Sequence, residues 1–329
     1  MNRKSKKKFA VFAGTGCRAC EKAILDIHYQ VHSLSPWTDI VFWPYVLGSR
    51  WEDLDDDVGI DVCFFIGAIR TSEERKAARR LREKAGILVA CGACAAYGGL
   101  PGLDNLSYAE CGRVESEPED SDLIPSVPSI ESRVSSLSQI VAVDFVIPGC
   151  PPTQNLLWAA MQALICGPES LTKLSYTVAR LPENISRAIT AGILPPNGSV
   201  FAGEKAVCAS CSRLKEEKKF KTVIRPYQKY EESGRCLLEQ GLVCLGISTR
   251  EGCGGICTAV GQPCRGCFGK PEGVYDPGAK MVSAISSTFE SESAQEIETM
   301  VDAFEDLTGT FYRYTLPSQC SLMSKPQEE

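Results

Sequence analysis

Histidine is scarce in this sequence, and long apolar runs are missing. Only two of the 329 residues are histidines, so any metal site must be built almost entirely from other ligands. No stretch approaches the roughly 20 apolar residues that a membrane-spanning helix requires. The basic start, Met1 to Lys8, leads into a strand-like run instead of the apolar segment of a signal peptide. We therefore expect a cytoplasmic protein with no membrane insertion.

An excess of positive charge is missing as well. Lysine and arginine total 35 against 41 aspartates and glutamates, which gives a formal net charge of -6. Nucleic-acid binding relies on clustered basic side chains, whereas here they are dispersed along the chain. We therefore expect no nucleic-acid partner. The 44% of hydrophobic residues is ordinary for a globular protein, and the length is sufficient for two domains.

Cysteine is the residue present in excess, with 17 copies. Disulfide frameworks belong to oxidising compartments, and the cytosol keeps thiols reduced. These cysteines are therefore either small buried apolar residues or thiolate ligands. With so little histidine available, thiolate sites of this kind would hold zinc or an iron-sulfur cluster.

The first half of the chain alternates strand and helix patterns. Helical patterns run over 21–32, from a capping box at Thr71–Glu74 to about Ala85, and from Thr153 to about Ile165. The β-rich runs between or before them each end in a loop that contains glycine or cysteine, and they cover 9–13, 62–66, 87–90 and 140–147. This alternation predicts an α/β fold with a parallel, doubly wound sheet in a first domain over residues 1–167.

The second half, residues 168–329, has few strand patterns, many glycines and a dense series of cysteines. This composition predicts an irregular domain that is stabilised by something other than a large apolar core. Ile297, Val301, Phe304 and Leu307 lie on one face of a closing helix pattern, and Gly309 is the expected stop.

The first group of cysteines follows the predicted strands. Cys17 and Cys20 come after the first strand, Cys94 after the third and Cys150 after the last. Ligands bind at the carboxyl ends of the strands in an open parallel sheet, so we expect the four thiols to converge and hold one cube-shaped cluster. A redox C-x2-C pair, or thiols buried by coincidence, is the alternative. Cys91 lies near enough to compete with Cys94 as the ligand.

Eight further cysteines form two groups of four in the second half. Two four-coordinate zinc sites and two iron-sulfur clusters fit this count, and the spacing barely separates them. The first group favours iron-sulfur, because a zinc site assembled from single cysteines at strand ends would be unusual. Cys63, Cys111, Cys166 and Cys320 lie outside any ligand-spaced motif. The two groups are Cys208, Cys211, Cys236 and Cys244, and Cys253, Cys257, Cys264 and Cys267.

Motifs in the same order along nearly the whole chain resemble the small subunit of nickel-iron hydrogenases. They resemble in particular the cytosolic, methyl-viologen-reducing type that works with heterodisulfide reductase. Each motif alone would be weak, but the set is highly specific. The matching stretches are GCRAC at 16–20, GACAAYGG at 92–99, VDFVIPGCPP at 143–152, PCRGC at 263–267, GAKM at 278–281 and GTFY at 309–312.

The resemblance implies a flavodoxin-like first domain and three 4Fe-4S clusters, with no catalytic residue in this chain. Electrons from H2 would enter from a hydrogenase-type large subunit and leave to an iron-sulfur adaptor and a flavin-containing acceptor subunit. The chain would be an oxidoreductase only as part of this complex. The implied ligands are Cys17, Cys20, Cys94 and Cys150 for the proximal cluster, Cys253, Cys257, Cys264 and Cys267 for the medial one, and Cys208, Cys211, Cys236 and Cys244 for the distal one.

The sequence departs from the family pattern near the expected interface with the large subunit. Ala19 replaces a usual glycine, Ile66 stands where an acidic residue is common, and Arg18 and Arg70 add positive charge. One alternative is therefore an electron-relay subunit whose large subunit lacks the nickel-iron site. A second alternative, from another class, is a zinc-stapled interaction or redox-sensing protein.

Overall fold

Six parallel strands form the central sheet of the computed structural model, in the order β2-β1-β3-β5-β7-β8. The strands are β1 (Lys7–Ala13), β2 (Thr38–Phe42), β3 (Ile60–Ile66), β5 (Ala85–Cys91), β7 (Phe145–Ile147) and β8 (Ser199–Val200). The structure describes residues 6–27, 32–54, 59–111, 128–167, 183–217, 219–228, 230–291, 293–304 and 306–321. The expected α/β fold with a parallel sheet is confirmed.

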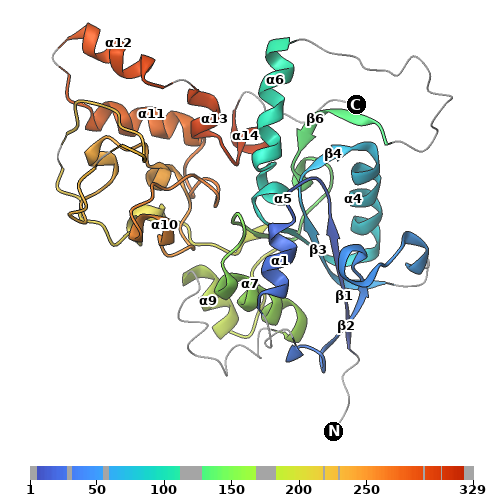
Figure 1. Ribbon diagram of the computed structural model, residues 1–329. Helices are drawn as coiled ribbons and strands as arrows, with labels where there is room; N and C mark the ends of the chain where they lie inside the picture. The colour runs from blue at the N-terminus through green and yellow to red at the C-terminus, as the bar shows by residue number, and fades with distance from the viewer. Residues whose placement is uncertain are drawn as a thin grey trace.

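Helices cover both faces of this sheet because neighbouring strand residues point in opposite directions. On β3, Val62 and Phe64 pack in the core layer that contains α1 (Ala19–Leu25) and α7 (Gln154–Met161). Cys63 and Phe65 pack in the opposite layer, which contains α4 (Ser72–Lys84) (Figure 1). A strand buried on both faces explains the continuous apolar run over 62–66.

The capping box predicted at Thr71 is present at the start of α4. The Thr71 hydroxyl accepts a hydrogen bond from the Glu74 backbone N–H at 3.3 Å, and the Glu74 carboxylate accepts one from the Thr71 backbone N–H at 3.0 Å. These two bonds satisfy donors that a helix leaves free in its first turn. The helix ends at Lys84, one residue before the predicted end.

The predicted strand over 140–147 is shorter in the structure. Only Phe145–Ile147 pairs in the sheet, and a 3-10 turn at Leu137–Gln139 comes before it. A second, antiparallel sheet joins β4 (Ile69–Thr71) to β6 (Ile130–Ser135). The sequence patterns also missed β2 and β8, which form the two edges of the central sheet.

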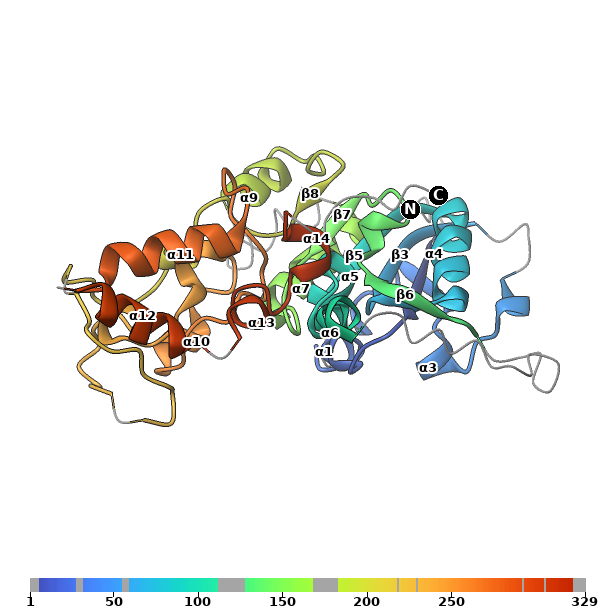
Figure 2. The same cartoon turned by 90° about the horizontal axis from the view of Figure 1, so that it is seen from above.

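Much of the second half of the chain forms a lobe beside the sheet (Figure 2), although β8 pairs with β7 in the sheet itself. The remaining helices are α3 (Pro44–Leu47), α5 (Ala93–Tyr97), α6 (Asp104–Cys111), α9 (Glu183–Thr190), α10 (Ile256–Ala259), α11 (Pro277–Thr288), α12 (Ala294–Asp302), α13 (Leu307–Phe311) and α14 (Leu316–Gln319). The domain boundary expected at 167/168 adjoins residues 168–182, which lie outside the described residues, and it stays a prediction.

The single closing helix predicted up to Gly309 is wrong. Helix α12 ends at Asp302, and a new helix, α13, runs through Gly309. The cause is Asp306, whose carboxylate accepts a hydrogen bond from the Gly309 backbone N–H at 2.7 Å and so provides a new N-cap. Gly309 therefore lies in the first turn of a helix instead of ending one.

Candidate metal centres

Loops from three parallel strands surround one small cavity at the carboxyl edge of the sheet. The loops after β1, β5 and β7 contribute the thiols of Cys17, Cys20, Cys94 and Cys150, and these four side chains line the cavity. The structure thus brings together the four cysteines that were predicted to converge. Their role as cluster ligands remains a prediction.

Backbone hydrogen bonds hold these loops against one another. The Gly92 N–H donates to the Ile147 carbonyl and the Ala93 N–H to the Gly149 carbonyl, both at 2.7 Å. These bonds tie the loop that carries Cys94 to the loop that carries Cys150. The loop of Cys17 is fixed through Thr15 and Ala68, which exchange a pair of backbone bonds at 2.7 and 3.0 Å.

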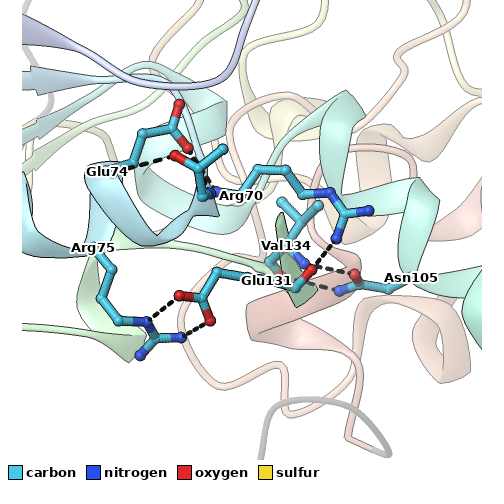
Figure 3. Close-up of polar contacts among 7 residues, drawn as sticks. Arg70, Glu74, Arg75, Asn105, Glu131 and Val134 are labelled. Atoms are coloured by element: carbon cyan, nitrogen blue, oxygen red, sulfur yellow. Dashed lines mark hydrogen bonds and ion pairs between the residues drawn. The ribbon is translucent and has the colours of Figure 1, made fainter. Parts of the chain in front are cut away.

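A partly buried carboxylate also anchors the first loop. Glu74 accepts hydrogen bonds from the Thr15 hydroxyl at 2.9 Å and from the Arg70 backbone N–H at 2.7 Å. Figure 3 shows Glu74 with Arg70, and beside them a two-pronged ion pair between Arg75 and Glu131. The Arg70 guanidinium pairs with Asp104 at 2.7 Å. The positive charge that the sequence places near the expected interface therefore has a partner within the chain.

Two glycines leave room for the sulfur atoms of this site. A Cβ atom on Gly92 would lie 2.3 Å from the Cys20 sulfur, and one on Gly99 would lie 2.4 Å from the Cys94 sulfur. Both glycines also have positive φ angles, +88° and +60°. Side chains at these two positions would fill the space occupied by the thiols, so the backbone forms a cradle in which N–H groups can approach a sulfur-rich group closely.

Three thiols of this cradle, those of Cys20, Cys94 and Cys150, have raised pKa values and are difficult to ionise in the absence of a cation. Burial, followed by the neighbouring thiolates of Cys91, Cys94, Cys150 and Cys17, raises the pKa of Cys20 far above its usual range. The same causes, burial first, raise the pKa of Cys94 to about 12. Metal ligation requires the thiolate form. A bound iron-sulfur core would supply the positive iron that offsets this repulsion, and the cradle fits such a group.

Cys91 occupies a different position from Cys94. Cys94 lines the cavity, whereas Cys91 is the last residue of β5 and is fully buried in the apolar layer. Burial raises the pKa of Cys91 to about 12. This geometry favours Cys94 as the ligand, with Cys91 as a buried neighbour of Cys20.

The cysteines of the second lobe also gather in two groups. In the medial group, burial raises the pKa of Cys253 and the Cys257 thiolate raises it further, against a larger opposing effect of the Gly255 backbone N–H. After burial, the Cys264 and Cys253 thiolates are the largest causes that raise the pKa of Cys267. Because these thiolate charges change one another's pKa values, the four predicted medial ligands must lie close together.

The predicted distal ligands lie together in the same way. The pKa of Cys208 is raised to about 11 by burial, then by the Cys236 and Cys211 thiolates. A Cβ atom on Gly246 would lie 3.2 Å from the Cys208 sulfur and 3.7 Å from the Cys244 sulfur. The structure also shows a contact that the spacing did not indicate, a 3.2 Å hydrogen bond from the Cys211 thiol to the Thr258 hydroxyl.

The three groups are in contact in series. The Cys264 backbone N–H donates a 3.3 Å hydrogen bond to the Cys244 sulfur, which joins the medial group to the distal one. The Cys150 thiolate is one of the charges that raise the pKa of Cys267, so the proximal group lies near the medial one. Tyr314, which no motif indicated, lies near this second junction, where it and Cys150 pack against the same small cluster of Ala93, Ala96 and Tyr97.

In the described ranges, no three His, Cys, Asp or Glu side chains lie close enough to share a single metal ion. The thiols around a four-iron cluster stand farther apart than those around one ion, because they bind different corners of the cluster. Among the helices that the structure describes, none has the length and apolar composition needed to cross a bilayer.

Comparisons with known proteins found relatives that match most of the chain. Residues 17–164 match the family model described as NADH ubiquinone oxidoreductase, 20 Kd subunit. A subunit of the F420-non-reducing hydrogenase of Methanothermobacter thermautotrophicus is 34% identical over 313 residues, which cover 92% of each chain. A vhu subunit of the F420-non-reducing hydrogenase of Methanocaldococcus jannaschii is 34% identical over 308 residues, with the same coverage.

A solved structure shows the same fold. The structure of the recombinant NiFeSe hydrogenase from Desulfovibrio vulgaris Hildenborough matches 88% of this chain and 99% of its own chain, with a TM-score of 0.50. The sequence identity over this match is 16%, so the likeness concerns the fold alone.

Proposed function

The chain belongs to the nickel-iron hydrogenase small-subunit family, together with its relatives from F420-non-reducing hydrogenases, and on this premise we propose its place in an electron path. It is the electron-transfer subunit of a cytoplasmic hydrogenase complex and binds three 4Fe-4S clusters. It relays electrons from H2 oxidation in a large subunit to an iron-sulfur adaptor and a flavin-containing acceptor subunit. In this proposal residues 1–167 hold the proximal cluster, and residues 168–329 hold the medial and distal ones.

One observation carries the proposal, namely that the three groups of thiols are connected in series between two exposed ends. Cys17 of the first group and Cys208 of the last are exposed. Between them lie the junction of Cys150 with Cys267 and the junction of Cys264 with Cys244. A path with an exposed thiol at each end suits a protein that takes electrons from one partner and delivers them to another.

The surface beside Cys17 supports contact with a large subunit at this end. Tyr45, Val46 and Leu47 on α3 are 62%, 41% and 53% exposed. The Arg18 guanidinium lies over the Tyr45 ring, 4.8 Å from its centre. Exposed apolar groups gathered in this way mark interaction surfaces. We assign the large subunit to this face, which lies next to the proximal group.

The residues of this chain hold and shield the clusters and perform no bond chemistry on an organic substrate. The clusters, when bound, supply one-electron storage at potentials that depend on hydrogen bonds and burial. Glu21 is one of the residues that hold the cluster site in place. It is buried next to Cys20 and accepts a 2.9 Å hydrogen bond from the Trp43 indole, which fixes α1 against the loop after β2.

The test uses the complex purified without oxygen together with its large partner. Exposure to H2 should reduce all three clusters, as followed by loss of visible absorbance and by EPR, and the large partner should contain nickel. In a complex with Cys253→Ala, H2 should still reduce the proximal cluster but no longer the distal one. Cys63→Ala is the matched control, because Cys63 lies in β3 away from all three groups, and it should behave as wild type.

The alternative is a relay subunit of a hydrogenase-like complex without nickel and iron. The observation that favours it is Arg18, a half-exposed cation between Cys17 and Cys20. A nickel-free large partner, with clusters that dithionite reduces and H2 does not, would establish this alternative and overturn the hydrogenase assignment.

A further inference from the structure

A pocket of about 180 Å³ in the second lobe is lined by three arginines and by no acidic residue. Its apolar lining comprises Ile224, Pro226, Val243, Leu245 and Pro263. The rest of the lining consists of Cys264, Thr310, Arg225, Arg265 and Arg313. We call this site the arginine pocket.

The three arginines come from segments that are far apart in the sequence. Arg265 stands between the paired cysteines at 264 and 267, and Arg313 follows the end of α13. Arg225 is held in place by α12, because its guanidinium donates a 2.9 Å hydrogen bond to the Ala303 carbonyl at the end of that helix. A cation is favourable at this end of a helix. The fold thus gathers three positive charges around one pocket.

Two of these charges have no counterion inside the chain. Within the residues that the structure describes, the side chains of Arg265 and Arg313 make no hydrogen bond and no ion pair. Arg70, Arg75 and Arg82, by contrast, each pair with a carboxylate at 2.6 to 2.9 Å. The chain as a whole has more acidic than basic residues, so the lack of an acid here is a local feature. Three like charges around one pocket repel one another, and an anion from outside the chain would relieve this repulsion.

The chemistry of the lining indicates which anion fits. The planar guanidinium fork matches the two oxygens of a carboxylate, and it also binds phosphate or sulfate. The apolar walls decide between these ligands. A small inorganic anion would leave Ile224 and Val243 in contact with water, whereas an acidic side chain on a protein segment brings apolar groups that cover them. The lining therefore favours an acidic protein segment.

The arginine pocket adjoins the junction of the medial and distal groups. Its lining residue Cys264 is a predicted medial ligand, and the Cys264 backbone N–H donates to the sulfur of Cys244, a predicted distal ligand. All the lining residues lie between positions 224 and 313, whereas Cys17, the exposed thiol of the proximal group, follows β1 in the sheet domain. A protein seated in this pocket is therefore placed at the distal end of the electron path.

We propose that the arginine pocket is the docking site for an acidic segment of the iron-sulfur adaptor that accepts the electrons. A carboxylate of the adaptor binds between Arg265 and Arg313, and its apolar neighbours cover Ile224 and Val243. The inference rests on the proposed function and adds the chemistry of the acceptor contact. Charge pairs of this kind speed association and fix the orientation of the two proteins, and salt weakens them.

The first experiment compares Arg313→Glu with Arg133→Glu in the complex of this chain with its large subunit. Arg133 is the matched control, because it is exposed on β6 in the sheet domain and its side chain has no ion pair within the described part of the chain. The affinity for the purified adaptor should fall about 10- to 100-fold in Arg313→Glu, as expected for the loss of a charged hydrogen bond. It should stay unchanged in Arg133→Glu, and wild-type binding should weaken as salt is added.

A zero-length cross-link identifies the partner. The variants Arg265→Lys and Arg313→Lys keep the positive charge and introduce an amine, which a water-soluble carbodiimide couples to a carboxylate in direct contact. Mass spectrometry should find the introduced amine joined to an aspartate or glutamate of the adaptor. Arg133→Lys, treated in the same way, should give no such product.

Several results would overturn the proposal. Unchanged adaptor affinity in Arg313→Glu would do so, and if sulfate binding were lost in the same variant, the pocket would be a site for small anions only. Coupling to the large subunit instead of the adaptor, or equal coupling in Arg133→Lys, would also contradict it. A failure of the proposed function is distinguishable, because it would appear in the wild type as missing iron or as clusters that H2 does not reduce.

Discussion

Replacing Gly92 by alanine should remove the proximal cluster and leave the other two in place. Gly92 has φ +88° and ψ 160°, a region that only glycine adopts readily. An alanine Cβ would in addition stand 2.3 Å from the sulfur of the buried Cys20. Because the neighbouring backbone is tied to Ile147 and Gly149, the thiol must move, and with it one of the four corners of the site.

The loss of stability in Gly92→Ala has two separate contributions. The backbone strain costs about 1–3 kcal/mol, and forcing a methyl group into filled space costs about 1–3 kcal/mol more. Gly198→Ala is the matched control, since Gly198 has φ +85° with no atom within 4 Å of the added Cβ. Gly198→Ala therefore carries a strained backbone angle without a steric clash. The difference in stability between the two variants then reports the clash with Cys20.

The assay is iron content per chain, with thermal unfolding as the second readout. Gly92→Ala should lose about four of about twelve irons, and Gly198→Ala should lose none. The clash should lower the melting temperature of Gly92→Ala by about 2–12 °C relative to Gly198→Ala, at about 2–4 °C for each kcal/mol. Equal iron in both variants would refute the view that Gly92 makes room for a ligand sulfur.

Three further variants test separate parts of the account. Cys63→Ala should keep its full iron content, because Cys63 is buried in the opposite core layer; loss of a cluster would contradict the ligand assignment. Cys208→His should keep the distal cluster and raise its midpoint potential, since neutral imidazole replaces an anionic thiolate, and an unchanged or lowered potential in redox-titrated EPR would count against Cys208 as a ligand. For Asp276, burial raises the pKa but hydrogen bonds, first from the Tyr312 hydroxyl, outweigh it and hold the pKa below its usual range. The stabilising contribution of Asp276 is thus complete above pH about 4 and is lost as the pH falls further. The free energy of unfolding of Asp276→Asn should therefore depend less on pH below that point than that of wild type. Identical plots of unfolding free energy against pH for the two proteins would disprove this.

Local signals with a short range were predictable from the sequence. The capping box at Thr71 needs only four consecutive residues, and the structure has it. The convergence of Cys17, Cys94 and Cys150 was also predictable, because parallel strands place their carboxyl ends at one edge whatever the order of the strands. Both features follow directly from the positions of the strands and helices along the chain.

Features that depend on contacts between distant segments were not predictable. Tyr314 lies near Cys150 only because the end of the described chain packs against α5, and no local pattern around residue 314 indicates that packing. The break between α12 and α13 escaped for a related reason. The apolar period continues through Phe304 and Leu307, and the Asp306 side chain starts a new helix within it.

The most direct test of the account is the metal and sulfide content of the protein purified without oxygen. Three cysteine-ligated cubane clusters predict about twelve irons and about twelve sulfides per chain, with no stoichiometric zinc. Two or more zinc ions per chain with iron near zero would contradict the account and would identify the thiol groups as structural zinc sites.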